Sequence, residues 1–326
     1  MSRDVRIIAK EREIVNNTIR SFFCARGYVE VETPVLVRSP GMEPNLVPFE
    51  TNVIEPDGKH HHAGLITSPE YSMKKLLGLG MEKIFTLAKV FRNEENLGGT
   101  HNPEFTMLEW YRQGADYVAC MDETEELVTD IYAAFDRVLP LFRRARVRDL
   151  FLEYVGIDLD LITAGCGDPA YSEALRRHGI RRDPSDTESD LYYRLFLALV
   201  EPKLGTDPIF VYDYPIHQAS LSRLTTDGKY GERFELYVDG LELCNAFTEL
   251  VDADEQRRRF FVEAEERRAL GKTVFPVDEE LLALLPSVRQ PTFGNALGVD
   301  RLHMLATGKT AIDDVLLFPA NHFFNA

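Results

Sequence analysis

The stretch from residue 84 to residue 112, IFTLAKVFRNEENLGGTHNPEFTMLEWYR, constrains the fold of this chain more than any other. It predicts two apolar strands joined by a polar loop that contains glycine. Because side chains alternate between the faces of a strand, four of them share one face of the second strand: Phe105, Met107, Glu109 and Tyr111. A carboxylate among apolar and aromatic groups requires a cationic partner. That partner is either Arg92, across the hairpin, or a ligand that Arg92 and Glu109 recognise through opposite charges.

A second hairpin is predicted over residues 232–250, ERFELYVDGLELCNAFTEL. Asp239-Gly240 between apolar runs is a strong signal for a two-residue turn, which pairs Val238 with Leu241 and Tyr237 with Glu242. Glu235 then lies diagonally across from Glu242 on the same face. These carboxylates either hold a cation such as Mg²⁺ or are solvated residues at a sheet edge. Asn245 and Glu249 join this face only if a β-bulge falls between Glu242 and Asn245.

The first part of the chain predicts a helix, a short strand, a loop and a second helix. Residues 9–26 have apolar residues at helical spacing, and Gly27 is a natural stop. Residues 36–62 contain many proline and glycine turn signals, which predicts a loop. Its consecutive histidines, 60–62, cannot all face one metal ion, so we expect them to be solvated. Ser68 and Pro69 then predict a helix start, with Glu70 in the first turn as a surface residue or a ligand.

Later segments predict further helices and one strand. Helices are expected at 118–139, with Val138 on the buried face, and at 252–271 with Asp252 as the cap. Residues 208–215 predict a strand, and residues 147–206 a helical insertion without recognisable chemistry. A last helix begins near Gly298, which places Arg301 in a first turn where the helix dipole disfavours a cation. Either a salt bridge, for example to Asp300, or an anionic ligand such as phosphate resolves this conflict.

Composition limits the classes of function. The 326 residues are 44% hydrophobic and 28% charged, which is typical of a soluble globular protein. No apolar run approaches the roughly 20 residues of a membrane span, and the N-terminus has no secretory segment. Four scattered cysteines without a CxxC pair predict reduced thiols in a cytoplasmic protein. The net charge of −16 argues against broad nucleic-acid binding. Neither a Rossmann nor a P-loop motif is present.

Three segments together resemble motifs 1, 2 and 3 of class II aminoacyl-tRNA synthetases: EVETP, FRNE with HNPEFTMLEWY, and GVDRLHML. They are similar in particular to the lysyl-tRNA synthetase catalytic domain, from about residue 9 to the C-terminus. The resemblance implies an α+β fold with an antiparallel sheet flanked by helices. It also implies one catalytic domain over residues 1–326 and a homodimer formed through motif 1. The chain starts with the catalytic core and not with an anticodon-binding OB domain, so we expect tRNA to be an unlikely acceptor.

Among short enzymes of this kind, the chain resembles the elongation factor P–lysine lysyltransferase family. Those enzymes activate lysine or β-lysine with ATP and Mg²⁺ and attach it to a lysine side chain of elongation factor P. Three features favour this family: Ser68 before Pro69-Glu70, QASL at 218–221, and Ala296, where the tRNA enzymes have glycine. The alternatives are a free-standing amino-acid ligase, an asparagine synthetase-like or residual lysyl-tRNA synthetase-like enzyme, and a non-catalytic paralogue.

The resemblance also implies roles for individual residues. Arg92 and Arg301 would be catalytic: Arg92 would contact the substrate carboxylate and the α-phosphate, and Arg301 would lie near the phosphates. Phe105 and Arg301 would sandwich adenine, while Glu235 and Glu242 would hold Mg²⁺ on ATP. The implied substrate-binding residues are Ser68, Pro69, Glu70, Arg92, Glu109, Tyr111, Asn245, Glu249 and Ala296. The implied ATP-binding residues are Arg92, Asn93, Glu94, His101, Asn102, Phe105, Glu242, Leu243, Gly298 and Arg301.

Two segments depart from the family pattern. The motif 2 loop, EENLGGT, is one residue longer than the family's loop and lacks its arginine. Only His101 is near enough in the sequence to assist the outer phosphates of ATP. The C-terminal segment LLFPANHFFNA is closer to the ending of the tRNA enzymes.

Overall fold

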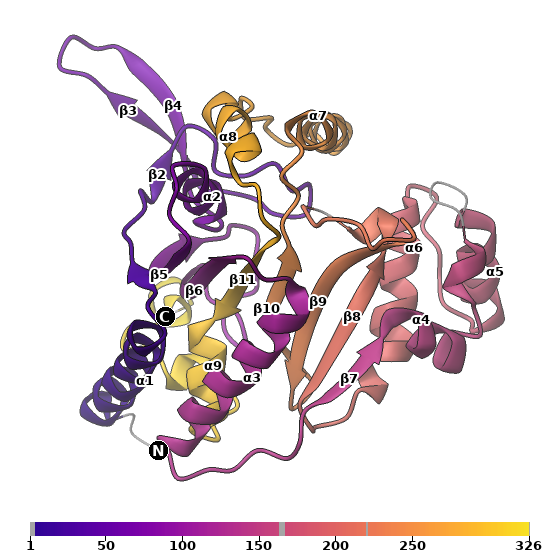
Figure 1. The fold of residues 1–326 in the computed structure, drawn as a ribbon, viewed down its shortest axis with the longest axis horizontal. Coiled ribbons are helices and arrows are strands. Elements are labelled where there is room, and N and C mark those ends of the chain that lie inside the picture. Colours follow the sequence, from indigo (N-terminus) through magenta and orange to yellow (C-terminus); the bar gives the residue numbers. More distant parts are fainter. Residues whose placement is uncertain (1–3, 163–166, 220, 326) are drawn as a thin grey trace. The chain divides into compact units, whose positions relative to one another are not determined.

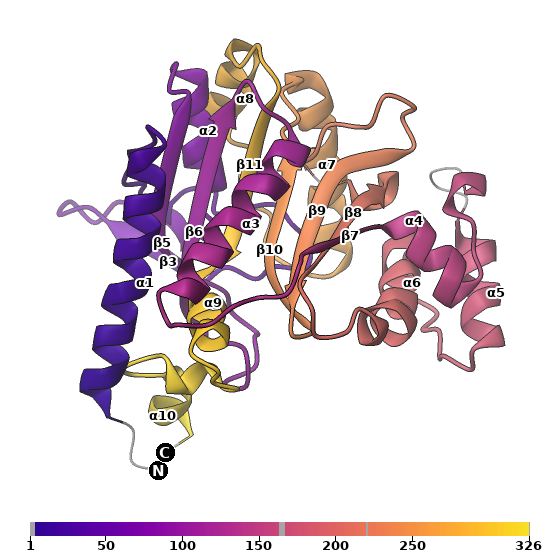
Figure 2. The same ribbon diagram turned by 60° about the horizontal axis from the view of Figure 1, so that its bottom comes forward.

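A computed structural model describes residues 4–162, 167–219 and 221–325 of the chain (Figures 1 and 2). The chain divides into two compact units. The first unit contains residues 1–115, 123–138 and 251–326, and the second contains residues 116–122 and 139–250. In the described ranges, no helix is both long and apolar enough to cross a membrane. The organisation of residues 1–326 as one catalytic domain stays a prediction.

The larger group of paired strands in the first unit has the order β1 (Val29–Glu30), β5 (Lys83–Phe91), β6 (Glu104–Gln113) and β11 (Thr292–Gly298). The predicted hairpin is confirmed as β5 and β6, in which Thr86 lies opposite Glu109. Strands β6 and β11 are also antiparallel, whereas β1 runs parallel to β5. These strands are therefore antiparallel except at the β1 edge, where the chain returns from a helix and not from a hairpin.

Helices cover both faces of these strands. On one face, Phe23 of α1 (Val5–Ala25) stacks on Phe85 with ring centroids 4.8 Å apart, and α1 runs alongside β5 (Figure 2). The same face receives α3 (Tyr117–Ala133), whose Thr124 hydroxyl accepts a hydrogen bond from the Asn295 amide at 2.9 Å. On the other face, α2 (Glu70–Gly78) packs against Tyr111. Glu109 and Tyr111 point to the α2 face, because residues two apart in a strand share a side.

The remaining helices of the first unit follow the second hairpin in sequence: α7 (Ala253–Ala269), α8 (Glu279–Leu284), η6 (Leu285–Ser287), α9 (Val299–Ala306), η7 (Ile312–Asp314) and α10 (Ala320–Phe324). The predicted cap of α7 is confirmed, since Asp252 accepts hydrogen bonds from the backbone N–H groups of Asp254 and Glu255 at 3.0 Å. The predicted start of α9 is also confirmed, with Gly298 at the N-cap.

The prediction of a loop over residues 36–62 is wrong. Strands β2 (Leu36–Val37), β3 (Glu50–Ile54) and β4 (His60–Leu65) form a separate sheet in the order β2-β4-β3, and β3 and β4 project as a ribbon (Figure 1). The turn signal at Asp57-Gly58 marks the tip of this hairpin, and the β-branched residues that favour a strand precede it in β3. The three histidines are exposed as expected, and in the described part of the chain no cluster of metal-ligating side chains exists.

The second unit contains four strands in the order β10 (Leu241–Thr248), β9 (Tyr230–Val238), β8 (Ile209–Pro215) and β7 (Arg143–Arg146). Only β7 and β8 run parallel. Residues 147–206 add short helices: α4 (Val147–Leu150), η1 (Phe151–Val155), η2 (Leu159–Leu161), α5 (Asp168–Arg177), α6 (Glu188–Leu195), η3 (Phe196–Val200) and η4 (Glu201–Lys203). A last short helix, η5 (Ile216–Gln218), follows β8. Aromatic side chains join the helices to the strands, as Phe196 packs near Tyr214 and Tyr237.

The second hairpin has the predicted turn and register. Asp239 and Gly240 have φ values of 54° and 71°, and Tyr237 lies opposite Glu242. The register shifts between Glu242 and Cys244, so the β-bulge that the sequence required is present. Asn245 consequently lies opposite Glu235, on the same face as Glu242.

Two other details differ from expectation or fall outside the description. Helix α3 ends at Ala133, earlier than predicted, and Val138 is 94% exposed. Asp136 takes a left-handed conformation with φ 55°, which ends the helical run before Val138. Cys24, Cys120 and Cys244 are free thiols. Cys166, and Ser220 of the QASL segment, lie outside the described residues.

Candidate active site

The centre of the first unit's candidate site is the buried carboxylate of Glu109. The residue is 1% exposed, accepts a hydrogen bond from the Tyr111 hydroxyl at 2.9 Å, and accepts another from the Ser68 hydroxyl. Burial, and after it the charge of Glu70, raises the pKa of Glu109 to about 8, although the two hydroxyl donors oppose the rise. Ser68 and Tyr111, rather than Arg92 across the hairpin, are thus the donors that hold this carboxylate.

Ala296 lies beside Glu109, and we call the surface formed by Ser68, Glu109, Tyr111 and Ala296 one wall of the candidate site. It lies directly opposite Glu109 in the neighbouring strand β11, where paired residues have Cβ atoms about 4.5–5.5 Å apart. Its methyl group packs against a small apolar cluster that includes Met107 and Phe105. The methyl group that distinguishes this sequence from the tRNA enzymes therefore adjoins the buried carboxylate.

Glu70 begins α2 beside this wall. Its backbone N–H donates to the Ser68 hydroxyl oxygen at 3.1 Å, so Ser68 caps the helix, although Pro69 occupies the N-cap position. The Glu70 carboxylate is paired with the ammonium of Lys74, whose side chain is only 3% exposed. Glu70 is thus a partly buried residue at a helix N-terminus, with a side chain 14% exposed, and not a fully solvated surface residue.

Two carboxylates near this wall were missed by the sequence reasoning. Burial, and then the charge of Glu70, raises the pKa of Glu43, and Oε2 of Glu43 is buried without a hydrogen-bond partner among the described residues. Burial also raises the pKa of Glu263 in α7 to about 8, with the charges of Glu43 and Glu70 adding to the rise. Neither residue carries a local signal, because one sits in a turn-rich segment and the other in a highly charged helix.

The segment that carries Glu43 is fixed by Arg267. This arginine is 2% exposed and donates to the carbonyl oxygens of Glu43 and Leu46, each at 2.9 Å, and of Thr273 at 2.7 Å. Gly41 in the same segment has φ 150°, in a region that favours glycine. The position of Glu43 is therefore set by a buried cation that is distant in sequence.

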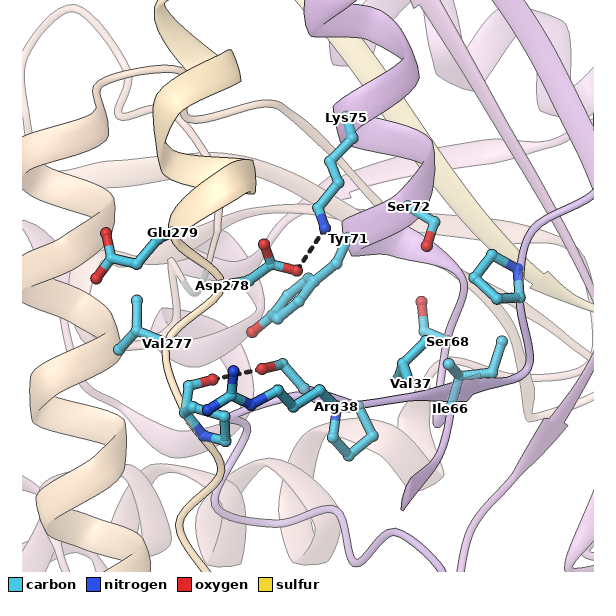
Figure 3. Close-up of a pocket in the computed structure, with 14 residues that line it drawn as sticks. Val37, Arg38, Ile66, Ser68, Tyr71, Ser72, Lys75, Val277, Asp278 and Glu279 are labelled. Atoms are coloured by element: carbon cyan, nitrogen blue, oxygen red, sulfur yellow. Dashed lines mark hydrogen bonds and ion pairs between the residues drawn. The ribbon is translucent and has the colours of Figure 1, made fainter. Parts of the chain in front are cut away.

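A cavity of about 650 Å³ adjoins Ser68 (Figure 3). Tyr71, Ser72 and Lys75 line it from one side of α2, and Asp278 faces them. The Lys75 ammonium lies 2.8 Å from an Asp278 carboxylate oxygen. Ser68 thus borders this cavity while its hydroxyl donates to Glu109.

The residues expected around ATP in the first unit form two small groups. In the first, the Arg92 guanidinium carbon lies 5.2 Å from the centre of the Phe105 ring. The Arg92 N–H donates to the Pro103 carbonyl at 2.9 Å, which closes the hairpin loop. Asn93 and Glu94 follow, with Glu94 at φ 59° and its N–H donating to the Asn93 side-chain oxygen at 3.0 Å.

In the second group, Arg301 meets the hairpin loop. Its Nη2 lies 3.0 Å from Nε2 of His101, and its Nε donates to the Thr100 carbonyl at 3.3 Å. The salt-bridge alternative for Arg301 named Asp300 as an example. Asp300 pairs with Arg12 and accepts a hydrogen bond from the Thr106 N–H at 2.7 Å.

Asn102 has a structural contact in addition to its expected place near ATP. Its side-chain oxygen accepts a hydrogen bond from the Ala320 N–H at 2.9 Å, and its amide donates to the Glu104 carbonyl. The Ile312 N–H donates to the Gly99 carbonyl at 2.7 Å. The hairpin loop is thereby bound to the C-terminal segment.

In the second unit, a buried ion pair organises the predicted residues. Arg233 and Glu235 have side chains that are each 7% exposed and lie 2.6 Å apart. Arg233 also donates to the Asn245 side-chain oxygen at 3.0 Å and to the Gln218 carbonyl at 2.7 Å. Arg233 was not predicted, although its spacing of two from Glu235 in a strand places both on one face.

Whether Glu235 and Glu242 can bind Mg²⁺ depends on how many acceptor positions of their carboxylates are already used by hydrogen-bond donors. Glu235 accepts hydrogen bonds from Arg233 and from the hydroxyls of Tyr214 and Tyr237, each at 2.6 Å. A carboxylate has about four acceptor positions, so at most one remains on Glu235. Glu242, opposite Tyr237, is only partly buried. The pair therefore fits an ion that arrives with ATP, with Glu242 as the more accessible ligand.

Leu243 and Glu249 complete the predicted set in the second unit. Leu243 is 2% exposed and sits at the bulge, and Glu249 is 3% exposed. Glu249 pairs with Ser222 through an isolated bridge, which fixes its backbone.

Comparisons of the chain with a family model and with known proteins agree on one family. A model of the family described as tRNA synthetases class II (D, K and N) matches residues 1–322. The chain is 40% identical to an elongation factor P–(R)-β-lysine ligase of Proteus mirabilis (strain HI4320), over 98% of this chain and 96% of that protein. It is 40% identical to the protein of that name from Pectobacterium atrosepticum, over 97% and 96%, and 39% identical to that from Haemophilus influenzae (strain PittGG), over 98% and 97%. The chain thus belongs to the class II synthetase family and, within it, to the family of these ligases.

Proposed function

We propose that this protein is an ATP-dependent ligase that activates lysine or β-lysine and transfers it to a lysine side chain of elongation factor P. The observation that carries the proposal is the buried Glu109 with Glu70 and Glu43 nearby, because an excess of interior carboxylates favours a ligand with more than one ammonium group. The names of the relatives supply the acceptor and the β-isomer.

The proposed reaction needs no nucleophilic side chain. A carboxylate oxygen of the amino acid attacks the α-phosphorus of ATP, and pyrophosphate leaves. The acceptor amine then attacks the carbonyl carbon of the aminoacyl adenylate, loses a proton, and expels AMP. Arg92 and Arg301 would stabilise charge on the carboxylate and the phosphates, and Phe105 would stack on adenine. Catalysis then depends on positioning and charge stabilisation.

The ammonium groups of the substrate would bind the acidic wall of the first unit. Glu70 would accept one ammonium and Glu109 the distal one, with Tyr111 fixing the Glu109 carboxylate. Ser68 lies between these glutamates, since its hydroxyl accepts from the Glu70 N–H and donates to Glu109. The roles of Asn245 and Glu249 in substrate binding stay predictions.

Magnesium bound to ATP would be held by Glu242, with Glu235 as the second carboxylate, and would neutralise phosphate charge. We expect Glu242→Gln to reduce pyrophosphate exchange at least tenfold and to change the melting temperature little, because Glu242 is partly exposed. The measurement is exchange rate against magnesium concentration. Glu280→Gln, at a side chain 72% exposed, is the control for loss of one charge. A Glu242→Gln enzyme with full activity and unchanged magnesium dependence would show that this carboxylate is only an edge residue.

The direct test combines adenylation with product analysis. Pyrophosphate exchange is measured with α-lysine, β-lysine and aspartate, and purified elongation factor P is then analysed by mass spectrometry after incubation with enzyme, ATP and each lysine isomer. We expect exchange with a lysine isomer, little with aspartate, and a mass increase on one lysine of the factor. Equal exchange with aspartate would contradict the substrate assignment.

The second candidate function is a free-standing lysine-activating ligase with another acceptor. The same acidic wall supports it, because that wall selects the amino acid and not the acceptor. Exchange with lysine but no modified elongation factor P would favour it. In either case we propose a cytoplasmic homodimer, on the motif 1 resemblance and on the relatives' named substrate, a translation factor.

A further inference from the structure

The contact between His101 and Arg301 has a definite proton arrangement. A guanidinium has only donors, so Nε2 of His101, 3.0 Å from Arg301 Nη2, must accept the hydrogen bond. The ring proton is then on Nδ1, which lies 3.2 Å from the Thr100 hydroxyl oxygen and can donate to it. Both ring nitrogens are therefore used by the neutral imidazole. A protonated ring would direct an N–H group at a cation.

The backbone brings His101 to this position through a tight turn. Gly98 and His101 exchange hydrogen bonds through their N–H and carbonyl groups at 3.1 and 3.2 Å. Gly98 and Gly99 have φ values of 92° and 65°, which residues with a side chain rarely adopt. Arg301 is bound on its other side to the Thr100 carbonyl. The turn thus presents two acceptors, one from the backbone and one from the imidazole, to one guanidinium.

We propose that His101, as a neutral imidazole, is a positioning residue that holds the Arg301 guanidinium for the phosphates of ATP, and that protonation of His101 releases this hold. The inference rests on the proposed function, because it assigns the anion near Arg301 to ATP. The proposal predicts that kcat/KM for ATP falls on mild acidification because the His101 ring becomes protonated.

The charged groups around His101 agree with a neutral ring. Burial, followed by the charges of Arg301 and Arg92, lowers the pKa of His101, while Glu95 opposes this effect. The Glu95 carboxylate is 3.9 Å from Nε2, farther than Arg301, and the His101 side chain is 37% exposed. The two arginines on one side thus outweigh the single carboxylate on the other.

The kinetic test compares the wild type with His101→Gln, since a glutamine carbonyl can accept the Arg301 hydrogen bond but cannot titrate. The value of kcat/KM for ATP is measured by pyrophosphate exchange from pH 5 to pH 8.5 at saturating lysine, because this ratio reports ionisations of the free enzyme. We expect the wild-type value to fall at least fivefold relative to His101→Gln between pH 7.5 and pH 5. Ionisation of ATP and of other enzyme groups cancels in the comparison.

A fixed positive charge provides the second arm. His101→Lys should reduce kcat/KM for ATP at least tenfold across the whole pH range, with a melting temperature close to that of the wild type. A ratio of wild type to His101→Gln that does not change with pH, or a His101→Lys enzyme as active as His101→Gln, would overturn the proposal.

A readout without catalysis separates this inference from the proposed function. The midpoint of His101 ring protonation, followed by NMR in the enzyme without ATP, should lie below 6.5 and rise in Arg301→Gln, where the neighbouring cation is absent. An unchanged midpoint would contradict the positioning role even in an active enzyme. Absence of exchange with every basic amino acid would instead refute the proposed function and leave this titration interpretable.

Discussion

At the scale of single residues, the proposed binding of lysine in the first unit depends on how far burial shifts the pKa of the Glu109 carboxyl group. With a pKa of about 8, Glu109 is largely protonated at pH 7 before substrate binds, and it must ionise to pair with an ammonium group. We therefore expect kcat/KM for lysine to rise with pH through about 8, measured by pyrophosphate exchange at saturating ATP. Tyr111→Phe removes a donor that stabilises the carboxylate, so the midpoint should move upward. A midpoint that is the same in both enzymes would contradict this role of Tyr111.

The same shift has a consequence for stability that needs no substrate. Between the ordinary glutamate pKa of about 4.3 and the folded-state value of about 8, the unfolded chain loses a proton that the folded protein keeps. The free energy of unfolding should therefore decrease as pH rises through this window, and Glu263 adds to the decrease. Urea denaturation at pH 5, 6.5 and 8 measures it, and Glu109→Gln should weaken the dependence.

Ala296 tests selection between lysine isomers. Ala296 lies opposite Glu109 in the adjoining strand, so we expect its methyl group to limit where an amino group can sit beside that carboxylate. One methyl group in a tight pocket is worth roughly 1–3 kcal/mol, or about 10- to 200-fold. We expect Ala296→Gly to shift the ratio of kcat/KM for β-lysine to that for α-lysine toward α-lysine. A folded variant whose ratio stays within about twofold of the wild type would leave Ala296 without a role in isomer choice.

At the scale of elements, the β9–β10 hairpin shows how local geometry positions several predicted residues at once. Gly240 has φ 71°, and a Cβ there would lie 4.0 Å from the Gly205 carbonyl oxygen, an ordinary contact distance, so substitution costs backbone strain and not a clash. We expect Gly240→Ala to lower the free energy of unfolding by about 1–2 kcal/mol in urea titrations. Gly240→Asn should lower it less, because asparagine tolerates this conformation. Equal effects of the two substitutions would indicate that strain in the turn is not the cause.

Elements with strong local signals were predictable from the sequence, and those set by distant residues were not. The β5–β6 and β9–β10 hairpins follow from alternation and from Asp239-Gly240, whereas the bulge was only a condition for Asn245 and Glu249 to share the face of Glu235 and Glu242. The β3–β4 hairpin was missed because its many turn residues obscured a short strand pattern. The roles of individual residues in ligand binding came from the family resemblance and not from the periodicity of apolar residues.

The residues of the candidate site also divide into those that the sequence could predict and those that only the fold reveals. Glu109 could be singled out because a carboxylate interrupts an apolar face. Glu43 and Glu263 could not, because their importance arises from burial near Glu70 in the folded chain. Arg267 likewise looks like any residue of a charged helix until its contacts with the Glu43 and Leu46 carbonyls are seen.

At the scale of the whole molecule, the net charge of −16 sets the expected choice of acceptor. Affinity for nucleic acid depends largely on neutralising phosphates with lysine and arginine. We expect aminoacylation of bulk tRNA at moderate salt to be at least a hundredfold slower than modification of elongation factor P. The measurement uses radiolabelled lysine or β-lysine, with a lysyl-tRNA synthetase on the same tRNA as the positive control. Efficient lysylation of tRNA would contradict this expectation.

The contact between the hairpin loop and the C-terminal segment has a consequence for the evolution of such sequences. The long motif 2 loop and the unusual C-terminal ending appear in the sequence as separate departures from the family. In the fold they adjoin, because a Cβ at Gly98 of the loop would lie 3.5 Å from the side-chain nitrogen of Asn321 in the ending. Next to this contact, Asn102 accepts a hydrogen bond from the Ala320 N–H. A chimera that took only one of the two segments from a relative would change one side of this contact and keep the other. The two segments should therefore be inherited, and exchanged, as a single unit.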